Sequence, residues 1–359
     1  MDTVAFPYRS AGHLALLHVV AESGSWEKYG LRVNYDYQIS SSDAHDLVPK
    51  GEVEFVGGNH VSTYAHRARG DNWVYLGQTL NQVNTRLVVR PDSEINSVAD
   101  LREKVVAVRG SHPSLNDWLY LKQNGLDVDR DEVVMHNPIR HKPGTMDPVD
   151  ADVEKKKQPL WHLIRDKKVD AAFLTAPSSL LAEEAGLKCI DIPPQPMIWF
   201  TTVSSSLGFA QKHPEIVERF LKGLIEGIHF FKTKREETIA IIQKRYNREG
   251  VMSLAHATFI YDNLAPYLEP KLYPKMTAIA NVYEEAKRQD PDAKKINPLE
   301  LWDMHHVRKL DDTGFIDALY AAPSQSNATS DSVPVSRVEL VAALKTCGHV
   351  EGESCGCDD

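Results

Sequence analysis

The stretch Gly51-Glu-Val-Glu-Phe-Val-Gly-Gly-Asn-His60, continued by Val61-Ser-Thr-Tyr-Ala-His-Arg-Ala-Arg-Gly70, decides the fold. Its apolar residues predict a strand that runs into Gly57 and Gly58, and Asn59 is expected to open a helix that carries His60. Glycines at a strand-to-helix turn allow a ligand to approach the backbone, and the free N–H groups of a new helix attract anions. The block therefore predicts an anion-binding turn.

The same pattern of a strand followed by small residues occurs three more times. The three turns are Ser10-Ala-Gly-His13, Arg109-Gly-Ser111 and Thr175-Ala-Pro177. Because open α/β sheets bind ligands at the carboxyl ends of their strands, we expect these turns to contribute to one site. The sequence thus predicts a partner that is a small organic anion.

Composition excludes several other classes of partner. The chain has 359 residues, enough for two lobes with separate cores, and a formal net charge of −9, which argues against nucleic acid. No apolar run approaches the ~18 residues that a membrane-spanning helix needs, so we expect no membrane insertion. The N-terminal sequence lacks the basic and apolar segments of a signal peptide, which predicts a cytoplasmic protein.

Short apolar runs alternate with helical patterns through the first two hundred residues, which is typical of an α/β fold with parallel sheets buried on both faces. The predicted strands are 3–6, 32–37, 53–56, 73–78, 86–90, 105–108, 132–136, 171–174, 189–192 and 199–204. The predicted helices between them are 13–21, 60–69, 114–123, 160–166 and 177–185. From Pro214 the pattern is almost purely helical, at 214–231, 235–246, 253–261, 273–288 and 298–309.

These elements predict five segments. Residues 1–88 form the first part of lobe 1, 89–197 form lobe 2, and 198–321 return to lobe 1 and continue as C-terminal helices. Residues 322–336 are too polar to bury a core and are interpreted as a flexible linker. Residues 337–359 are expected to hold a short helix and a cysteine-rich tail.

Five pieces of the sequence occur in a family-like order: the opening strand, 22–33, 51–70, 98–108 and 168–172. This order resembles the type II periplasmic-binding-protein fold of sulfonate-, nitrate- and taurine-binding proteins and of thiamine-pyrimidine synthase-like proteins. The resemblance covers about residues 1 to 235. It implies two α/β lobes joined by crossover strands near 87–90 and 198–204, a ligand between the lobes, and a helical C-terminal extension.

Two enzyme branches of this fold differ from the chain at their hallmark residues. The pyrimidine synthases have a cysteine-rich iron loop where this chain has Pro193-Pro-Gln-Pro-Met-Ile-Trp-Phe200, and Ser62 stands at their histidine position. The aromatic desulfinases resemble the chain at Gly57 and Gly58, but their nucleophilic cysteine falls near Ser10 or Ala11. A thiol nucleophile is therefore excluded at that place.

His13 and His60 are the candidate catalytic residues, because each follows a strand whose carboxyl end should border the site. An imidazole pair can serve as general acid and base or hydrogen-bond a carboxylate. The alternative is that each histidine caps or packs against its helix. The candidate substrate-binding residues are Ser10, Gly57, Gly58, Asn59, Arg86, Arg109, Ser111 and Thr175. For Arg109 and Ser111, an exposed arginine and an ordinary helix cap remain the alternative.

No cofactor is predicted. Cys347, His349, Cys355 and Cys357 form a soft ligand set for a metal, with an unstructured tail as the alternative. His305 and His306 are interpreted as surface or core residues rather than ligands.

Two functions are compatible with these residues. The first is a cytoplasmic enzyme that acts on a small aromatic carboxylate or sulfur-oxyacid by decarboxylase, lyase or hydrolase chemistry. The second is a transporter-type solute-binding protein or a ligand sensor without catalysis. The fold serves both, so the fold alone does not decide between them.

Overall fold

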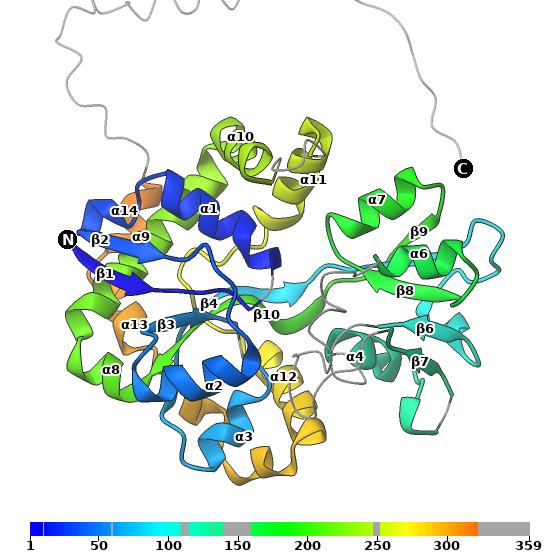
Figure 1. Ribbon diagram of the computed structural model, residues 1–359, viewed down its shortest axis with the longest axis horizontal. Helices are drawn as coiled ribbons and strands as arrows, with labels where there is room; N and C mark the ends of the chain where they lie inside the picture. The colour runs from blue at the N-terminus through cyan, green and yellow to red at the C-terminus, as the bar shows by residue number, and fades with distance from the viewer. Residues whose placement is uncertain are drawn as a thin grey trace, which may run out of the picture. The chain divides into compact units, whose positions relative to one another are not determined.

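The first lobe alternates strands and helices as the sequence predicts. A computed structural model describes residues 1–9, 11–58, 60–108, 115–130, 132–138, 159–246 and 252–321 (Figure 1). The first elements are β1 (Asp2–Ala5), η1 (Ala11–His13), α1 (Leu14–Glu22), η2 (Glu27–Tyr29), β2 (Leu31–Asn34), α2 (Ser41–Lys50), β3 (Phe55–Gly57), α3 (Thr63–Ala68) and β4 (Trp73–Val83). The predicted linker and tail lie outside the described residues.

The second lobe has the same alternation and is followed by helices. Its elements are β5 (Arg86–Val89), η3 (Val98–Leu101), β6 (Val105–Ala107), α4 (Leu115–Gln123), η4 (Val128–Arg130), β7 (Val134–His136), α6 (Leu160–Arg165), β8 (Ala171–Leu174), α7 (Ser178–Glu184) and β9 (Lys188–Asp191). The return strand is β10 (Gln195–Ser206). The helices after it are α8 (Leu207–Lys212), α9 (Pro214–Thr233), α10 (Arg235–Tyr246), α11 (Leu254–Leu264), α12 (Met276–Gln289), η6 (Pro291–Lys295), η7 (Pro298–Leu301), α13 (His305–Asp312) and α14 (Phe315–Tyr320).

The sheets are mixed, so the expectation of purely parallel sheets is wrong. Within the described residues the strand orders are β1-β2, β3-β10-β4 and β7-β6-β8-β5-β9. Pairing is parallel for β1 with β2 and for β6 with β7 and β8. It is antiparallel wherever β5 or β10 takes part. β10 lies between β3 and β4, and β5 lies between β8 and β9, so both are antiparallel strands inside their sheets. Mixed sheets of this kind are common among α/β proteins.

Two long antiparallel strands connect the lobes. β4 and β10 pair along their length, from Trp73 opposite Ser206 to Val83 opposite Gln195 (Figure 1). The predicted second crossover, 198–204, lies inside β10. The first crossover lies before Arg86 and not at 87–90, because all four residues of β5 pair with β8 and β9 in the sheet of the second lobe.

The largest core cluster is aromatic at its centre and joins the first lobe to the C-terminal helices. The Phe55 ring stacks on Phe220 of α9 at 4.1 Å, and Phe6 meets Phe220 edge-on at 4.9 Å. Trp26 is buried against the same phenylalanine. The helical stripe of α9 that the sequence predicts is therefore the face that covers the first lobe. No helix among the described residues is both long and apolar enough to span a bilayer.

A buried asparagine attaches the C-terminal helices to the crossover. Asn81 of β4 is 3% exposed; its Nδ2 donates to Tyr273 O at 2.8 Å and its Oδ1 accepts from Lys275 N at 2.7 Å. On α12, Asn281 Nδ2 donates to Pro196 O of β10 at 2.7 Å. Residues before and on α12 thus hold both crossover strands, as expected for helices that brace a hinge.

We expect Asn81→Ala to lower the free energy of unfolding by about 2 kcal/mol, because it removes a buried side chain together with its two part-buried hydrogen bonds, to Tyr273 O and from Lys275 N. Urea denaturation of the full chain measures the loss. Asn281→Ala is the control, since its hydrogen bond is open to water and its loss should cost less than about 1 kcal/mol. Equal losses in the two variants would contradict the role given to Asn81.

Candidate anion-binding site

The turns after β1 and β3 lie against each other. Tyr8 forms parallel bridges to both Gln38 and Gly57. Gly57 N donates to Pro7 O at 2.9 Å, and Arg9 N donates to Gly57 O at 3.2 Å. The prediction that the carboxyl ends of the first and third strands are neighbours is therefore confirmed.

Buried hydroxyl groups of β10 hold the turn after β3. Ser204 Oγ donates to Gly58 O at 2.9 Å and Ser205 Oγ donates to Glu54 O at 2.6 Å. Gly58 N donates to Thr202 O at 3.0 Å. Since Thr202, Ser204 and Ser205 are fully buried, these bonds fix the backbone from 54 to 58 on the crossover strand.

His60 is not on a helix, because α3 begins at Thr63 and not at Asn59. Asn59 lies outside the described residues. His60 is instead half-buried in the turn, where its Nδ1 lies 2.8 Å from Thr202 Oγ1. Its ring centroid is 6.5 Å from that of Trp199. The imidazole is thus positioned by the crossover strand rather than by the helix that follows.

The hydrogen bonds around Gln78 assign the tautomer of His60. Gln78 Nε2 donates to the carbonyl oxygens of Leu80 and Trp199, which orients its Oε1 toward Thr202. The Thr202 hydroxyl donates its one proton to that Oε1 at 2.6 Å. Thr202 Oγ1 must therefore accept from His60, so the proton of the neutral ring is on Nδ1 and Nε2 carries a lone pair.

His13 is buried at the start of α1. It is 5% exposed, and its Nδ1 lies 3.0 Å from Thr201 Oγ1. Its ring stacks on Phe200 with centroids 5.3 Å apart and planes 9° apart. Phe200 has a φ of 65°, and the pairing of β10 with β4 shifts register on either side of it. A bulky residue in left-handed conformation at a bulge is strained, and such strain is concentrated at functional sites.

Gly57 and Gly58 pack closely and have no free N–H group in this structure, and their part in ligand binding stays a prediction. Both N–H groups already donate to backbone carbonyls, Gly57 to Pro7 and Gly58 to Thr202. A Cβ on Gly57 would lie 3.4 Å from His13 Nδ1, and one on Gly58 would lie 2.8 Å from Arg9 Cγ. Gly58 also has a φ of 120°. A glycine is required at Gly58, where a Cβ would overlap Arg9 and where the φ is positive, whereas a Cβ on Gly57 would make only ordinary contacts.

Electrostatics keep both histidines neutral. Burial, the nearby His60 and Arg9 lower the pKa of His13 to about 3. Burial and the positive charge of Arg9 lower the pKa of His60 to about 4. Arg9 Nη1 donates to Ile39 O. Two unprotonated imidazoles and one guanidinium therefore share this place, and no described carboxylate raises either histidine pKa.

The other predicted site residues are in the second lobe or are not described. Arg86 pairs with Glu183, Nη1 to Oε2 at 2.7 Å, and with Asp191, Nε to Oδ1 at 2.8 Å. Thr175 O accepts from Ser179 N at the start of α7. Their part in ligand binding stays a prediction. Ser10, Arg109, Ser111 and the tail ligands Cys347, His349, Cys355 and Cys357 lie outside the described residues.

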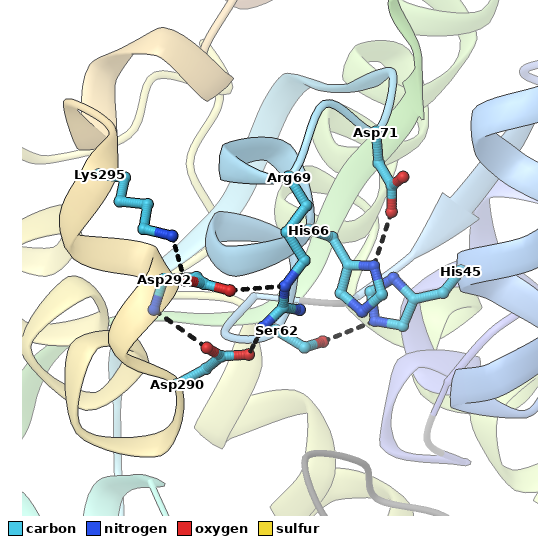
Figure 2. A network of polar contacts seen from close by, with 8 residues as sticks. All are labelled: His45, Ser62, His66, Arg69, Asp71, Asp290, Asp292 and Lys295. Carbon is cyan, nitrogen blue, oxygen red and sulfur yellow. Dashed lines mark hydrogen bonds and ion pairs between the residues drawn. The ribbon is translucent and has the colours of Figure 1, made fainter.

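The second half of the 51–70 block is structural (Figure 2). His66 of α3 stacks on His45 of α2 with ring centroids 3.6 Å apart, and its Nδ1 lies 2.7 Å from Asp71 Oδ2. His45 Nε2 lies 2.8 Å from Ser62 Oγ. On the other side of α3, Arg69 pairs with Asp290 and Asp292 beside η6. This network anchors α3 between α2 and the C-terminal helices.

Sequence reasoning missed Gln78, Phe200, Thr201 and Thr202. A signal for the threonines exists: the strand Phe200-Thr-Thr-Val-Ser-Ser-Ser206 has five hydroxyl residues where a buried strand is predicted. Buried hydroxyls need partners. Such a run therefore indicates that the strand supports another element through its side chains.

The family comparison agrees with this arrangement. A family model described as NMT1/THI5 like matches residues 13–238, which is more than half of the chain. The chain belongs to the NMT1/THI5-like family. The matched part of this NMT1/THI5-like protein includes His13, both glycines, His60 and all of β10. No curated protein matches the sequence significantly.

Solved structures show the type II periplasmic-binding-protein fold. The aliphatic sulfonate-binding protein SsuA of Escherichia coli is 15% identical with a TM-score of 0.61, over 84% of this chain and 96% of that chain. SsuA of Xanthomonas axonopodis pv. citri, bound to MOPS, is 13% identical with a TM-score of 0.60, over 85% and 99%. The desulfurization enzyme DSZB is 14% identical with a TM-score of 0.58, over 87% and 99%. The predicted α/β fold with C-terminal helices is thus confirmed, and its neighbours include both binding proteins and an enzyme.

Proposed function

We propose that this NMT1/THI5-like protein binds a small organic anion, a sulfonate or a carboxylate, at Arg9, His13 and His60. The observation that carries the proposal is geometric: Arg9 and His13 pack against the turn after β3 that carries His60, so one guanidinium and two imidazoles meet at one place. The N-terminal end of α1, beside His13, adds a positive helix-dipole end. Positive charge in a partly buried place favours an anionic group.

Binding without proton transfer is the function that the site supports best. With pKa values of about 3 and 4, both imidazoles are unprotonated at neutral pH and supply no acidic proton there. The ideal catalytic acid or base has a pKa near the working pH. In its neutral form the His60 ring can still accept, at Nε2, a hydrogen bond from a ligand that carries an O–H or N–H group.

An enzymatic function is the second candidate, and one observation favours it. Thr202 and Gln78 hold His60 with the proton on Nδ1, as an orienting group does for a general base, and the Nε2 lone pair is available. A cytoplasmic decarboxylase, lyase or hydrolase acting on an aromatic acid would use this lone pair. Product formation separates this candidate from simple binding.

Sulfonates and sulfinates are the first ligands to test, because SsuA proteins bind alkanesulfonates and a DSZB variant is solved with biphenyl-2-sulfinic acid. Alkanesulfonates, aromatic sulfinates and aromatic carboxylates are to be added to the purified full chain, with thermal shift and titration calorimetry as readouts of binding. Mass spectrometry of the same mixtures detects any product.

We expect Arg9→Met to weaken binding of the best ligand by at least about tenfold, because a hydrogen bond to a charged group is worth about 1.5–3 kcal/mol. Arg165→Met, which removes an exposed arginine of α6, is the control and should bind normally. Wild-type affinity in Arg9→Met would refute the proposed site. Turnover that is lost in His60→Ala would establish the second candidate.

A further inference from the structure

The segment Trp302-Asp303-Met304-His305-His306 follows η7 and includes the first two residues of α13. Its backbone is attached to the crossover strand β4, where Trp302 bridges Tyr75 and Asp303 N donates to Tyr75 O at 2.9 Å. Val307, directly after His306, and Leu310, one turn further along α13, are in the hydrophobic core. The three polar residues are therefore presented by rigid elements.

Asp303, His305 and His306 form a cluster of metal-ligand type. One potential ligand atom from each residue lies within 4.8 Å of the other two. His305 Nδ1 is 2.5 Å from Asp303 Oδ1, and the two imidazole rings are 3.7 Å apart between centroids. Ligand atoms around a tetrahedral zinc ion at about 2.0–2.1 Å are roughly 3.4 Å apart, so only small side-chain rotations are needed.

His306 provides a second, independent indication of a ligand. Its side chain is fully buried, yet neither ring nitrogen has a hydrogen-bond partner among the described residues. The nearest acidic atom, Glu218 Oε1, is 3.8 Å from Nδ1, which is beyond hydrogen-bond range, and it accepts from Lys309 Nζ at 2.6 Å. A buried polar group without a partner costs about 1–3 kcal/mol, so such a group in a rigid segment needs an explanation.

We propose that Asp303, His305 and His306 bind a divalent transition-metal ion of the zinc type. Two imidazoles and one carboxylate are a donor set that such ions prefer. His306 supplies the buried ligand, and His305, 63% exposed, gives the ion access from solvent. Glu218 or water completes the coordination. From the sequence, both histidines were expected to be surface or core residues rather than ligands.

The surrounding charges are mixed. The N-terminal end of α13 and Lys309 oppose a cation, while Asp303 and Glu218 favour it. Lys309 is exposed and can leave Glu218 without unfolding the helix.

The test must separate this site from the cysteine-rich tail. Zn²⁺ is titrated calorimetrically into the EDTA-treated full chain and into a full-length variant with Cys347→Ser, Cys355→Ser and Cys357→Ser. We expect the serine variant to keep one equivalent of Zn²⁺. Loss of all binding in it would place the metal on the tail and overturn the proposal.

Within the serine variant, we expect His305→Ala and Asp303→Asn each to weaken Zn²⁺ binding by at least about tenfold, since even loss of an outer partner of a ligand has this effect. Both positions are partly or fully exposed, so these variants should fold even if His306→Ala does not. His213→Ala removes a histidine beside Glu215 and is the control that should bind normally. Unchanged affinity in both ligand variants would refute the site.

Cobalt gives a spectroscopic readout. Co²⁺ added to the serine variant should produce visible d–d bands without the near-ultraviolet charge-transfer band of a thiolate ligand. These bands should disappear in His305→Ala and persist in His213→Ala. A thiolate band that remains in the serine variant would indicate Cys189 as the ligand and contradict the assignment.

Discussion

Replacing Gly223 and Gly227 together by alanine is expected to lower the free energy of unfolding by about 4 kcal/mol. The two glycines are one helical turn apart on α9 and are buried. A Cβ on Gly223 would lie 2.3 Å from Trp26 Cδ1 and 3.0 Å from Trp26 Cα. A Cβ on Gly227 would lie 2.6–2.8 Å from three atoms of Val20. Neither Trp26 nor Val20 can move away without shifting its backbone.

The sign of the effect makes this prediction specific. In an open helix, alanine in place of glycine stabilises by about 1 kcal/mol at each position. Overpacking costs about 1–3 kcal/mol per site. Two sites near the upper end of this range, minus the gain in helix propensity at both positions, give the expected net loss of about 4 kcal/mol. Urea denaturation measures it, and Ala240→Leu, at an exposed position of α10, is the control with little effect. A rise in stability of the double variant would show that α1 and α9 do not pack this closely.

Helices and strands could be predicted from the sequence where apolar residues recur at a regular spacing and where the flanking residues mark both ends. β8 and α10 begin and end where expected, because a run of four apolar residues and a long helical pattern each have defined flanks. α9 begins at Pro214, which suits the first turn of a helix. The apolar residues of α9 form a stripe along one face of the helix, and this stripe indicates that the face packs on the first lobe.

Elements governed by tertiary contacts could not be predicted in this way. α2 was missed because its sequence Ser41-Ser-Asp-Ala-His-Asp-Leu-Val-Pro-Lys50 is polar and has a proline near its end. Its helix depends on the Ser40 cap and on burial of Ala44 and Val48. The late start of α3 has a similar cause, since His60 bonds to Thr202, a residue 142 positions away. Local propensity carries no information on such a bond.

The candidate site also contains some residues that could be predicted from the sequence and others that could not. His13, His60 and the glycine pair could be found because each follows a strand. Gln78 and Thr202 were not found, because their roles depend on how β4 and β10 pair. Both threonines that contact the histidines are on a crossover strand. A ligand that contacted His13 or His60 would therefore act on a strand that connects the two lobes.

The tautomer of His60 predicts that binding of a sulfonate without O–H or N–H groups takes up a proton. In the free protein Nε2 carries a lone pair, which repels an anionic oxygen, so the ring must be protonated to bind it. The pKa of free His60 is lowered to about 4, so the ring is neutral above that pH. Above this pH, the free-energy cost of protonating the His60 ring rises with each pH unit. We expect affinity to fall about tenfold per unit from about pH 5 upward, until the pKa of His60 in the complex is reached.

Calorimetry in two buffers of different ionisation enthalpy counts the protons taken up, and we expect close to one per sulfonate in the wild type. His60→Gln cannot titrate and should show neither proton uptake nor a slope with pH. Thr202→Val preserves the shape of the buried side chain but removes the acceptor of the Nδ1 proton. The ring is then free to carry its proton on Nε2 and donate to the anion while neutral. We therefore expect Thr202→Val to bind the sulfonate without proton uptake. A wild-type affinity that is constant from pH 5 to pH 7 would show that His60 does not contact the anion, whereas uptake that persists in Thr202→Val would show that the hydrogen bond to Thr202 does not set the tautomer.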